Sequence, residues 1–160
     1  KAKSISLLNQ YKPILVEEYI QGYEITVWII GNKGNYELVQ PLIISANGNY
    51  YFESRIFTIN DKANHIRNYS LPQTVLHTEI VSEIKNKSTE IFEILGMRDY
   101  GRIDFRVNNN NIYFIEANAL PIFSQTSEIG QISKLCNISY NEICKKLIAT
   151  ITNRLMSETN

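Results

Sequence analysis

The feature that most constrains the fold is a pair of alternating segments on either side of an asparagine-rich turn, at residues 101–118. Apolar and polar residues alternate in each segment, which is the pattern of a β-strand with one buried face. The turn holds four consecutive asparagines at positions 108–111. Asparagine tolerates the left-handed backbone conformations that tight hairpin turns require. The pattern therefore predicts a β-hairpin.

The predicted hairpin gathers polar side chains at one end. Alternation places Arg102, Asp104 and Arg106 on one face of its first strand. On the second strand, alternation predicts one shared face for Ile112, Phe114, Glu116 and Asn118. If the register centres on the asparagine turn, Asp104 can lie opposite Glu116 and Asn118.

Two carboxylates and a carboxamide at one end of a sheet have two interpretations. Close carboxylates repel unless they are protonated or bridged by a cation, and oxygen-rich sets suit hard cations such as Mg²⁺ or Mn²⁺. The alternative is an ordinary cross-strand salt bridge between Arg102 and Glu116. The spacing of the residues leaves both interpretations open.

Upstream of the hairpin, β-branched and aromatic residues predict further strands. Residues 14–20 read as a short buried strand, or as a hinge whose exposed backbone pairs with a ligand, and 24–30 as its antiparallel neighbour. Residues 36–45 read as a strand that Pro41 confines to an edge or a bulge. Asn47–Gly48 predicts a hairpin turn into a strand over 50–57.

Polar and helical patterns occupy the rest of the chain. Residues 58–70 lack periodicity and predict a long loop, of the kind that covers active sites. Ser70 with Gln73 resembles a capping box for a helix that ends at Gly96. A short helix is expected from Ser127 or Glu128 to residue 135, and a second capping box at Ser139 precedes a helix over 143–155. The element order predicts an α+β fold, with helices packed on one face of an antiparallel sheet.

Composition excludes several functional classes. The formal net charge is +0, so bulk electrostatics favour neither nucleic acid nor an acidic membrane surface. No run reaches membrane-spanning length, and two cysteines give no disulfide framework, which predicts a cytoplasmic protein. Residues 1–13 resemble the last turns of a preceding helical subdomain, and 14–156 form the main domain. We therefore expect the C-terminal part of a longer enzyme.

Two separated motifs carry a family resemblance. Arg102-Ile-Asp104-Phe followed by Glu116-Ala-Asn118 resembles the metal-binding signature of ATP-grasp enzymes. The continuation Ala119-Leu-Pro121 with Ser127, and the upstream stretch of residues 16–24, look most like the D-alanine–D-alanine ligase branch. The resemblance spans nearly all of residues 14–155 and implies the C-terminal ATP-grasp subdomain of a peptidoglycan-synthesis enzyme.

The resemblance implies a role for each matching residue. Glu17, Glu18, Tyr19 and Ile20 would form the hinge that meets adenine. Glu24 would bond the ribose hydroxyls. Two Mg²⁺ or Mn²⁺ ions would be held by Asp104, Glu116 and Asn118.

Further roles concern catalysis and the substrates. Arg102 would face the reacting phosphoryl group, and Ser127 would receive the carboxylate of the second substrate. ATP would phosphorylate one carboxylate, and an amine would then attack the acyl phosphate. The implied partners are small amino-acid substrates and the N-terminal part of the same enzyme, with a homodimer left open. Without that part, the chain is expected to be inactive.

Three departures from the family pattern bear on the substrates. Ile122 stands where the family usually has glycine after its proline, and Arg55 stands where a lysine usually approaches the phosphates. Glu128 follows Ser127 where the family tends to be apolar, and an acidic group there would disfavour an acceptor that carries a carboxylate. The alternatives are an ATP-grasp ligase for another amino acid or natural-product precursor, and a non-catalytic nucleotide-binding module.

Overall fold

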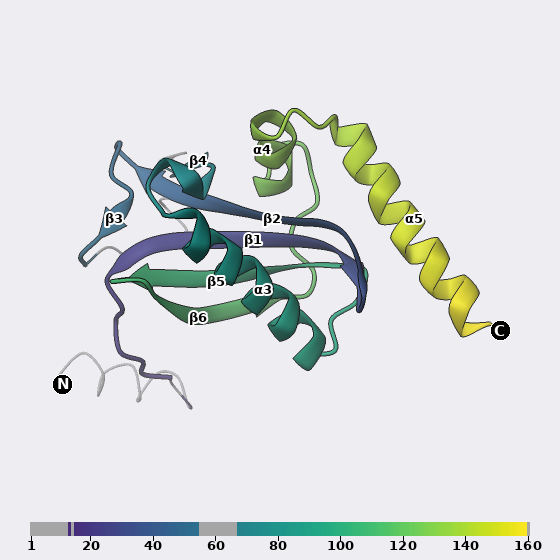
Figure 1. Ribbon diagram of the computed structural model, residues 1–160, viewed down its shortest axis with the longest axis horizontal. Coiled ribbons are helices and arrows are strands. Elements are labelled where there is room, and N and C mark those ends of the chain that lie inside the picture. Colours follow the sequence, from purple (N-terminus) through teal and green to yellow (C-terminus); the bar gives the residue numbers. More distant parts are fainter. Residues whose placement is uncertain (1–12, 14, 55–66, 160) are drawn as a thin grey trace.

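The computed structural model describes residues 13, 15–54 and 67–159, and within them the fold is a six-stranded antiparallel sheet with helices on both faces (Figure 1). The principal strand order is β4-β2-β1-β5-β6, and β3 pairs with the start of β1. The strands are β1 (Gly22–Asn32), β2 (Asn35–Ala46), β3 (Tyr51–Phe52), β4 (Arg67–Ser70), β5 (Tyr100–Asn108) and β6 (Asn111–Asn118). The helices are the 3₁₀ helix η1 (Pro72–Thr74), α3 (Thr78–Ile94), α4 (Glu128–Leu135) and α5 (Tyr140–Glu158).

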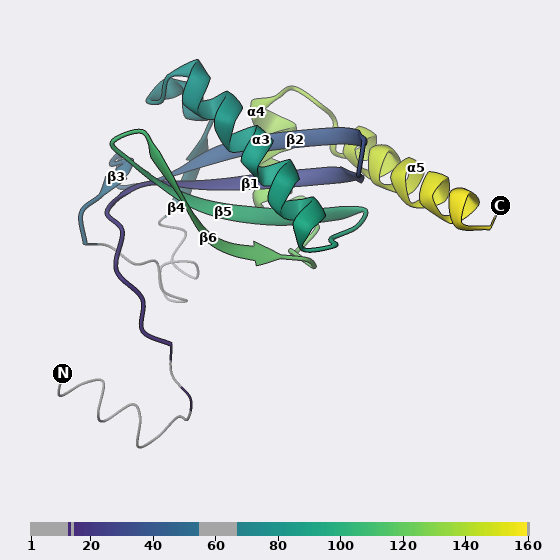
Figure 2. The ribbon, with the colours of Figure 1, turned by 60° about the horizontal axis from the view of Figure 1, so that its bottom comes forward.

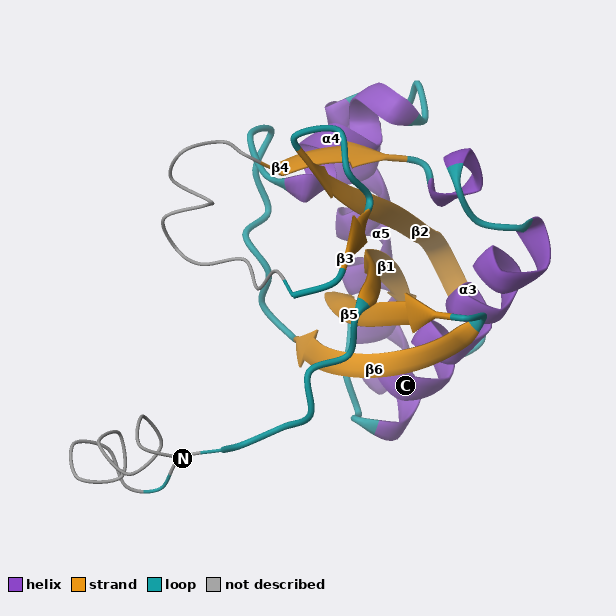
Figure 3. Ribbon diagram, turned by 90° about the vertical axis from the view of Figure 1, so that its left-hand side faces the viewer, coloured by secondary structure: helices purple, strands orange, loops and turns teal. Residues whose placement is uncertain are grey.

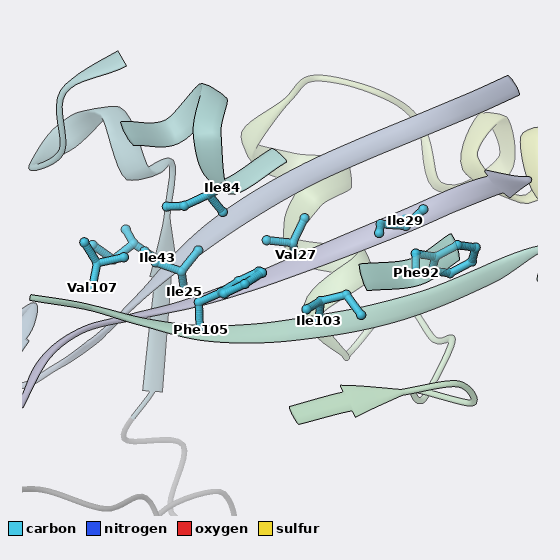
Figure 4. Close-up of a cluster of buried hydrophobic side chains, with 9 residues drawn as sticks. All are labelled: Ile25, Val27, Ile29, Ile43, Ile84, Phe92, Ile103, Phe105 and Val107. Atoms are coloured by element: carbon cyan, nitrogen blue, oxygen red, sulfur yellow. The ribbon is translucent and has the colours of Figure 1, made fainter. Parts of the chain in front are cut away.

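The central strand β1 is buried on both faces. Ile25, Val27 and Ile29 point into a core shared with α3 and β5 (Figure 4). Trp28 and Ile30 belong to a second core, on the opposite face, shared with α4 and α5. The nearly continuous apolar run of β1 follows from this arrangement, because both of its faces exclude water.

The two cores correct the expectation that all helices pack on one face of the sheet. The helix α3 crosses one face, while α4 and α5 lie against the other (Figures 1 and 2). Periodicity shows which side of a helix is apolar, but it does not show which face of the sheet that side covers. The α+β class and the antiparallel sheet are confirmed.

The strand predicted over residues 14–20 is wrong for the part that the structure describes. Residues 15–20 have no regular secondary structure, and Leu15 and Val16 are 81% and 75% exposed. The segment leads away from the sheet (Figure 3). The physical reason is that β2 and β5 already pair with the two edges of β1, and β3 pairs with its first residues. No edge of β1 remains for another strand.

Two other boundaries differ from the expectation. The strand predicted over 50–57 is reduced to Tyr51–Phe52 within the described residues, and residues 55–57 lie outside them. The predicted loop 58–70 ends in the strand β4, which pairs with the last residues of β2. Residues 58–66 and the predicted N-terminal helix lie outside the described part of the chain.

The helix start predicted at Ser70 is also wrong. Ser70 pairs with Ile43 in the β-ladder, and its hydroxyl lies 3.1 Å from the hydroxyl of Tyr50. The α-helix begins at Thr78, with His77 in the N-cap position. The predicted end is confirmed, because Gly96 adopts a φ of 64° directly after the helix.

Three further local predictions are confirmed. The central hairpin turns at Asn109 and Asn110, with φ values of 49° and 64°. Asn47 and Gly48, with φ values of 52° and 80°, form the other predicted turn. Ser139 caps α5, because its hydroxyl accepts a hydrogen bond from the backbone of Glu142 at 3.1 Å. Among the described helices, none is long and apolar enough to cross a membrane.

Candidate functional site

The polar end of the β5–β6 hairpin depends on a shift in strand register. From the turn, the pairing runs regularly as far as Phe105 opposite Phe114. The next pair is Asp104 opposite Glu116, so Ile115 is an extra residue on β6. Such a bulge reverses the alternation of side chains beyond it. Without it, Ile115 would lie opposite Asp104.

The bulge corrects one expectation and supports another. Ile112 and Phe114 pair with Val107 and Phe105, so they lie on the apolar side of the hairpin, and not with Glu116 as predicted. The rings of Phe105 and Phe114 are in edge contact, with centroids 6.4 Å apart. Beyond the bulge, β6 turns its polar residues to the other face.

The polar face beyond the bulge brings together the predicted phosphoryl-binding arginine and the predicted metal-binding residues. Glu116 lies opposite Asp104, and Asn118 lies opposite Arg102. On the other side of β5, Thr26 of β1 pairs with Asp104. Arg102, Asp104, Glu116 and Asn118 therefore occupy two rungs of one ladder on the same face of the sheet, with the Ile103–Ala117 pair between them.

Arg102 links the two carboxylates. Its Nε and Nη2 atoms donate to the two oxygens of Asp104 at 2.9 Å and 2.8 Å, and Nη2 also donates to Glu116 at 3.0 Å. Thr26 donates its hydroxyl to Asp104 at 2.8 Å. The cross-strand salt bridge that the sequence left open is thus present. It coexists with the clustering of oxygens that a metal site needs.

Burial gives the Asp104 carboxyl an unusual affinity for protons. Desolvation raises its pKa to about 6, although the guanidinium of Arg102 and the hydroxyl of Thr26 act in the opposite direction. A buried carboxylate in this state gains from any additional cation nearby. Glu116, with 59% of its side chain exposed, provides the accessible member of the pair.

The oxygen atoms of Asp104, Glu116 and Asn118 are chemically suited to a hard cation, provided that two conditions are met. Within the described residues, no group of three or more His, Cys, Asp and Glu side chains could hold a metal ion. A site here therefore needs the carboxamide oxygen of Asn118, which now accepts a hydrogen bond from the backbone of Leu120 at 3.0 Å. It also needs Arg102 to release part of its contact with Asp104 and Glu116. Carboxylate and amide oxygens are the ligands that Mg²⁺ and Mn²⁺ prefer.

A cleft of about 610 Å³ extends from this cluster towards α4. Arg102, Glu116 and Asn118 line one part of it, and Ser127 and Glu128 line another. Ser127 precedes α4, and its hydroxyl donates to the carbonyl of Ser124 at 2.9 Å. The predicted second-substrate residue and two of the three predicted metal-binding residues, Glu116 and Asn118, thus open onto one cavity, whereas Asp104 is not among the residues that line it.

Glu128 is paired within the cleft. Its Oε1 atom accepts a hydrogen bond from the hydroxyl of Tyr69 at 3.2 Å and lies 4.0 Å from Nη1 of Arg102. Burial, together with the charge of Glu128, raises the pKa of Tyr69 to about 12, so Tyr69 stays a hydrogen-bond donor. Because Arg102 lies near Glu128, it partly compensates the negative charge of Glu128.

Ile122 also lines the cleft, and its side chain is largely exposed.

The predicted adenine-side residues are only partly brought together. Glu17 and Glu18 are exposed in the irregular segment, whereas Tyr19, Ile20 and Glu24 all contact Arg106. Arg55 lies outside the described residues. Glu24 lies two residues before Thr26 on β1, which corresponds to about 7 Å along a strand and the same face of the sheet.

The sequence-based prediction gave no role to three residues at the site. Thr26 and Tyr69 hydrogen-bond to predicted site residues, and Arg106 contacts the adenine-side group. For Thr26 a signal exists, since it is a polar residue within an apolar strand. Alternation had already placed Arg106 on the polar face of its strand, although no role was predicted for it. Tyr69 gives no such signal, because its place follows from the pairing of β4 with β2.

Comparisons with known proteins agree with this architecture. Residues 3–149 match the family described as D-ala D-ala ligase C-terminus. The D-alanine–D-alanine ligase of Desulforamulus reducens is 32% identical over 143 residues, which cover 89% of this chain and 44% of that enzyme. The corresponding ligase of Ruminiclostridium cellulolyticum is 30% identical over 150 residues, which cover 92% of this chain and 38% of that enzyme.

Solved structures show the same fold. The crystal structure of the Bacillus anthracis D-alanine–D-alanine ligase complexed with ATP matches with a TM-score of 0.73 and 21% identity, over 100% of this chain and 50% of that chain. The VanG D-Ala:D-Ser ligase of Enterococcus faecalis matches with a TM-score of 0.61 and 20% identity, over 84% of this chain and 37% of that chain. The chain spans less than half the length of the two curated relatives above. It belongs to the D-Ala–D-Ala ligase C-terminal family of ATP-grasp proteins.

Proposed function

We propose that this chain is the C-terminal part of an ATP-dependent carboxylate–amine ligase of the D-alanine–D-alanine ligase type. The observation that carries the proposal is the register shift at Ile115, which sets Glu116 opposite Asp104 and Asn118 opposite Arg102. A salt bridge alone would need neither the carboxamide nor the adjoining cleft. The set instead matches the oxygen donors and the cation that phosphoryl transfer requires.

The polar side chains of the hairpin then have two roles, which are metal binding and phosphoryl binding. Asp104, Glu116 and Asn118 hold magnesium or manganese, in two ions by analogy with the family. When bound, the metal neutralises negative charge on the phosphates of ATP. Arg102 moves from its contact with the carboxylates to the transferring phosphoryl group, where its planar guanidinium donates several hydrogen bonds at once.

The nucleotide would extend from the metal-binding residues along the sheet towards β3. Glu24 lies on the same sheet face as Asp104, and the backbone of Ile20 lies nearby through their shared contact with Arg106. The match to a ligase structure that is complexed with ATP supports ATP as the nucleotide. Glu17, Glu18, Tyr19 and Ile20 would approach adenine, and Arg55 would approach the phosphates.

The acceptor substrate would bind in the cleft between the hairpin and α4. Ser127 would receive its carboxylate. The pairing of Glu128 with Tyr69 and Arg102 lowers the electrostatic penalty that an acidic residue imposes on such a substrate. An amino acid as acceptor, D-alanine first, is therefore compatible with the cleft.

One observation favours a second candidate, which is a ligase for another amino acid or natural-product precursor. Ile122 places a largely exposed apolar side chain on the cleft beside Glu128, and these are the positions where the chain departs from the family pattern. The ATP chemistry would be the same, and the acceptor would differ. Under either candidate the enzyme would work in the cytoplasm, and the chain without its N-terminal part would not turn over.

The experiment is an ADP-release assay on the full-length ligase that contains this chain, with ATP and Mg²⁺. We expect D-alanine to stimulate ADP release and a dipeptide to form. Stimulation by another amino acid but not by D-alanine would select the second candidate. If no amino acid stimulated ADP release, while the protein bound ADP, the chain would be part of a non-catalytic nucleotide-binding module.

A further inference from the structure

The buried residue Arg106 lies on the same face of β5 as Asp104, and the chemistry proposed above assigns it no role. Arg106 is only 7% exposed, and it lies two residues beyond Asp104 on the same strand face. Arginine is almost never this deeply buried unless it is paired, because the desolvation of a charge costs several kcal/mol. The position therefore has to offer compensating contacts.

Those contacts come from three separate segments of the chain. Nη2 of Arg106 donates to the carboxylate of Glu24 at 3.0 Å, and Nη1 donates to the hydroxyl of Tyr19 at 3.1 Å and to the carbonyl of Ile20 at 3.4 Å. The guanidinium also lies over two aromatic rings, 5.3 Å from the centroid of Tyr19 and 5.6 Å from that of Phe52. One side chain thus joins β5 to β1, to β3 and to the segment before β1.

The segment before β1 gains most from this arrangement. Residues 15–20 have no regular secondary structure, so no β-ladder fixes them against the sheet. Arg106 supplies contacts to Tyr19 and Ile20, and the hydroxyl of Tyr19 donates in turn to the carbonyl of Phe52 at 3.3 Å. The orientation of residues 15–20 relative to the sheet therefore depends on the side chain of Arg106.

Glu24 is held in the same way. Its Oε2 atom pairs with Arg106, and its Oε1 atom lies 3.9 Å from Nη2 of Arg67. Each oxygen faces a different arginine, which restricts the carboxylate to one orientation. Carboxylate and carbonyl oxygens each have two lone pairs, so Glu24 and the carbonyl of Ile20 can still accept hydrogen bonds from a ligand.

We propose that Arg106 is a positioning residue for the adenosine half of the nucleotide site. It holds the carbonyl of Ile20 and the carboxylate of Glu24 in the orientation that binds a nucleobase amino group and ribose hydroxyls. The inference rests on the proposed function for the identity of the ligand. Because the contacts exist before the ligand arrives, they reduce the ordering that binding would otherwise require. Arg106 should therefore affect nucleotide affinity and leave the chemical step largely unchanged.

Three variants of the full-length protein test this role. Arg106→Met keeps an unbranched apolar stem and removes the charge and every donor. Arg106→Lys keeps the charge but cannot reach Glu24, Tyr19 and Ile20 together. Arg154→Met is the matched control, because Arg154 makes a similarly paired contact with Asp99, just before the other end of β5.

The first measurement is ADP affinity by titration calorimetry with EDTA present, so that the metal site does not contribute. The second measurement is the separation of KM for ATP from kcat. For Arg106→Met we expect the Kd for ADP and the KM for ATP to rise roughly tenfold or more, with kcat and the KM for the amino acid within about threefold. Arg106→Lys should recover part of the affinity. Arg154→Met should lower stability and leave the Kd for ADP unchanged.

The outcomes separate this inference from the proposed function. If Arg106→Met and Arg106→Lys both bound ADP as wild type does, Arg106 would be only a structural residue and the inference would fall, while ligase activity stood. If wild type bound ADP and the variants did not, with no amino acid stimulating ADP release, the inference would stand and the ligase proposal would fall. If Arg106→Met did not fold, the Lys variant would decide. Wild type that failed to bind ADP in EDTA would overturn the inference, and the ADP-release assay with Mg²⁺ would still decide the proposed function.

Discussion

Asp104 and Glu116 face each other across the β5–β6 hairpin because Ile115 is left out of the strand pairing. A regular ladder would put the side chain of Glu116 on the apolar face with Ile103, against the core beneath α3. The bulge instead places it within 3.0 Å of Arg102. A single extra residue therefore decides whether Glu116 meets Arg102 and Asp104.

Replacing Glu116 tests the metal-binding role. Glu116→Gln keeps the size of the side chain and removes the charge that would balance a divalent cation. We expect ADP release by the full-length ligase to fall roughly 100-fold or more, because metal stabilisation of the phosphates supplies several kcal/mol. Glu90→Gln, on the exposed side of α3, serves as the control and should leave activity unchanged.

A crystallographic measurement complements the Glu116 variant. Mn²⁺ soaked into crystals of the full-length protein should give an anomalous signal between Asp104, Glu116 and Asn118. A signal elsewhere, or full activity in Glu116→Gln, would contradict the assignment of these ligands.

Replacing Arg102 tests the phosphoryl-binding role. Arg102→Lys keeps a positive charge but cannot form the forked contact with Asp104 while reaching Glu116. We expect kcat to fall by about 100-fold, as happens when a preorganised transition-state donor is lost, with a smaller change in the KM for ATP. Arg98→Lys, at an exposed arginine, is the matched control. Equal kcat values for both variants would place the catalytic arginine elsewhere.

The ion pair between Asp99 and Arg154 should make stability depend on pH. Arg154 donates to both oxygens of Asp99 at 2.8 Å, and these hydrogen bonds lower the pKa of Asp99 below its ordinary value. A lowered native pKa stabilises the fold above the unfolded-state value of about 4, and this contribution is lost as the pH falls through the native value. Asn suits the backbone at this position, where φ is 67°.

Asp99→Asn isolates that contribution. We expect it to lower the free energy of unfolding by about 1.5–3 kcal/mol at pH 7, as measured by urea denaturation. The difference from wild type should shrink as the pH falls below about 4, because the carboxyl is then protonated in the unfolded state while it stays ionised in the native state. The difference should level off once the pH is below the lowered native pKa of Asp99, where the carboxyl is protonated in both states. A difference that stayed constant between pH 7 and pH 3 would show that the charge of Asp99 is not its cause.

Replacing Gly130 tests how closely α4 packs against the loop that precedes it, beside the cleft. Alanine usually stabilises a helix by about 1 kcal/mol relative to glycine. Here, however, a Cβ atom would clash with the carbonyl oxygen of Gln125, which backbone atoms cannot accommodate without moving. Gly130→Ala should therefore lower stability by about 1–3 kcal/mol and raise the KM for the acceptor. Ser82→Ala, on the exposed side of α3, should do neither.

Local sequence patterns were sufficient for several features of this protein. The paired asparagines at the central turn, Gly96 after α3 and Ser139 before α5 each act within a few residues, so their effects do not depend on the rest of the fold. The alternation along β5 also correctly separated Asp104 from its apolar neighbours. The family itself was recognisable, because its motifs are short and contiguous.

Tertiary structure alone decided the features that depend on long-range pairing. Residues 15–20 carry an apolar strand-like pattern, but β2, β3 and β5 occupy the edges of β1. Ser70 is of a residue type that commonly caps helices, but it belongs to β4, which pairs with β2. The bulge at Ile115 follows from how β6 meets β5, and periodicity cannot reveal it, because a slip of one residue leaves the sequence unchanged and reverses every side chain beyond it. The sequence therefore determined which polar groups the hairpin carries, and the pairing of the strands determined that they meet.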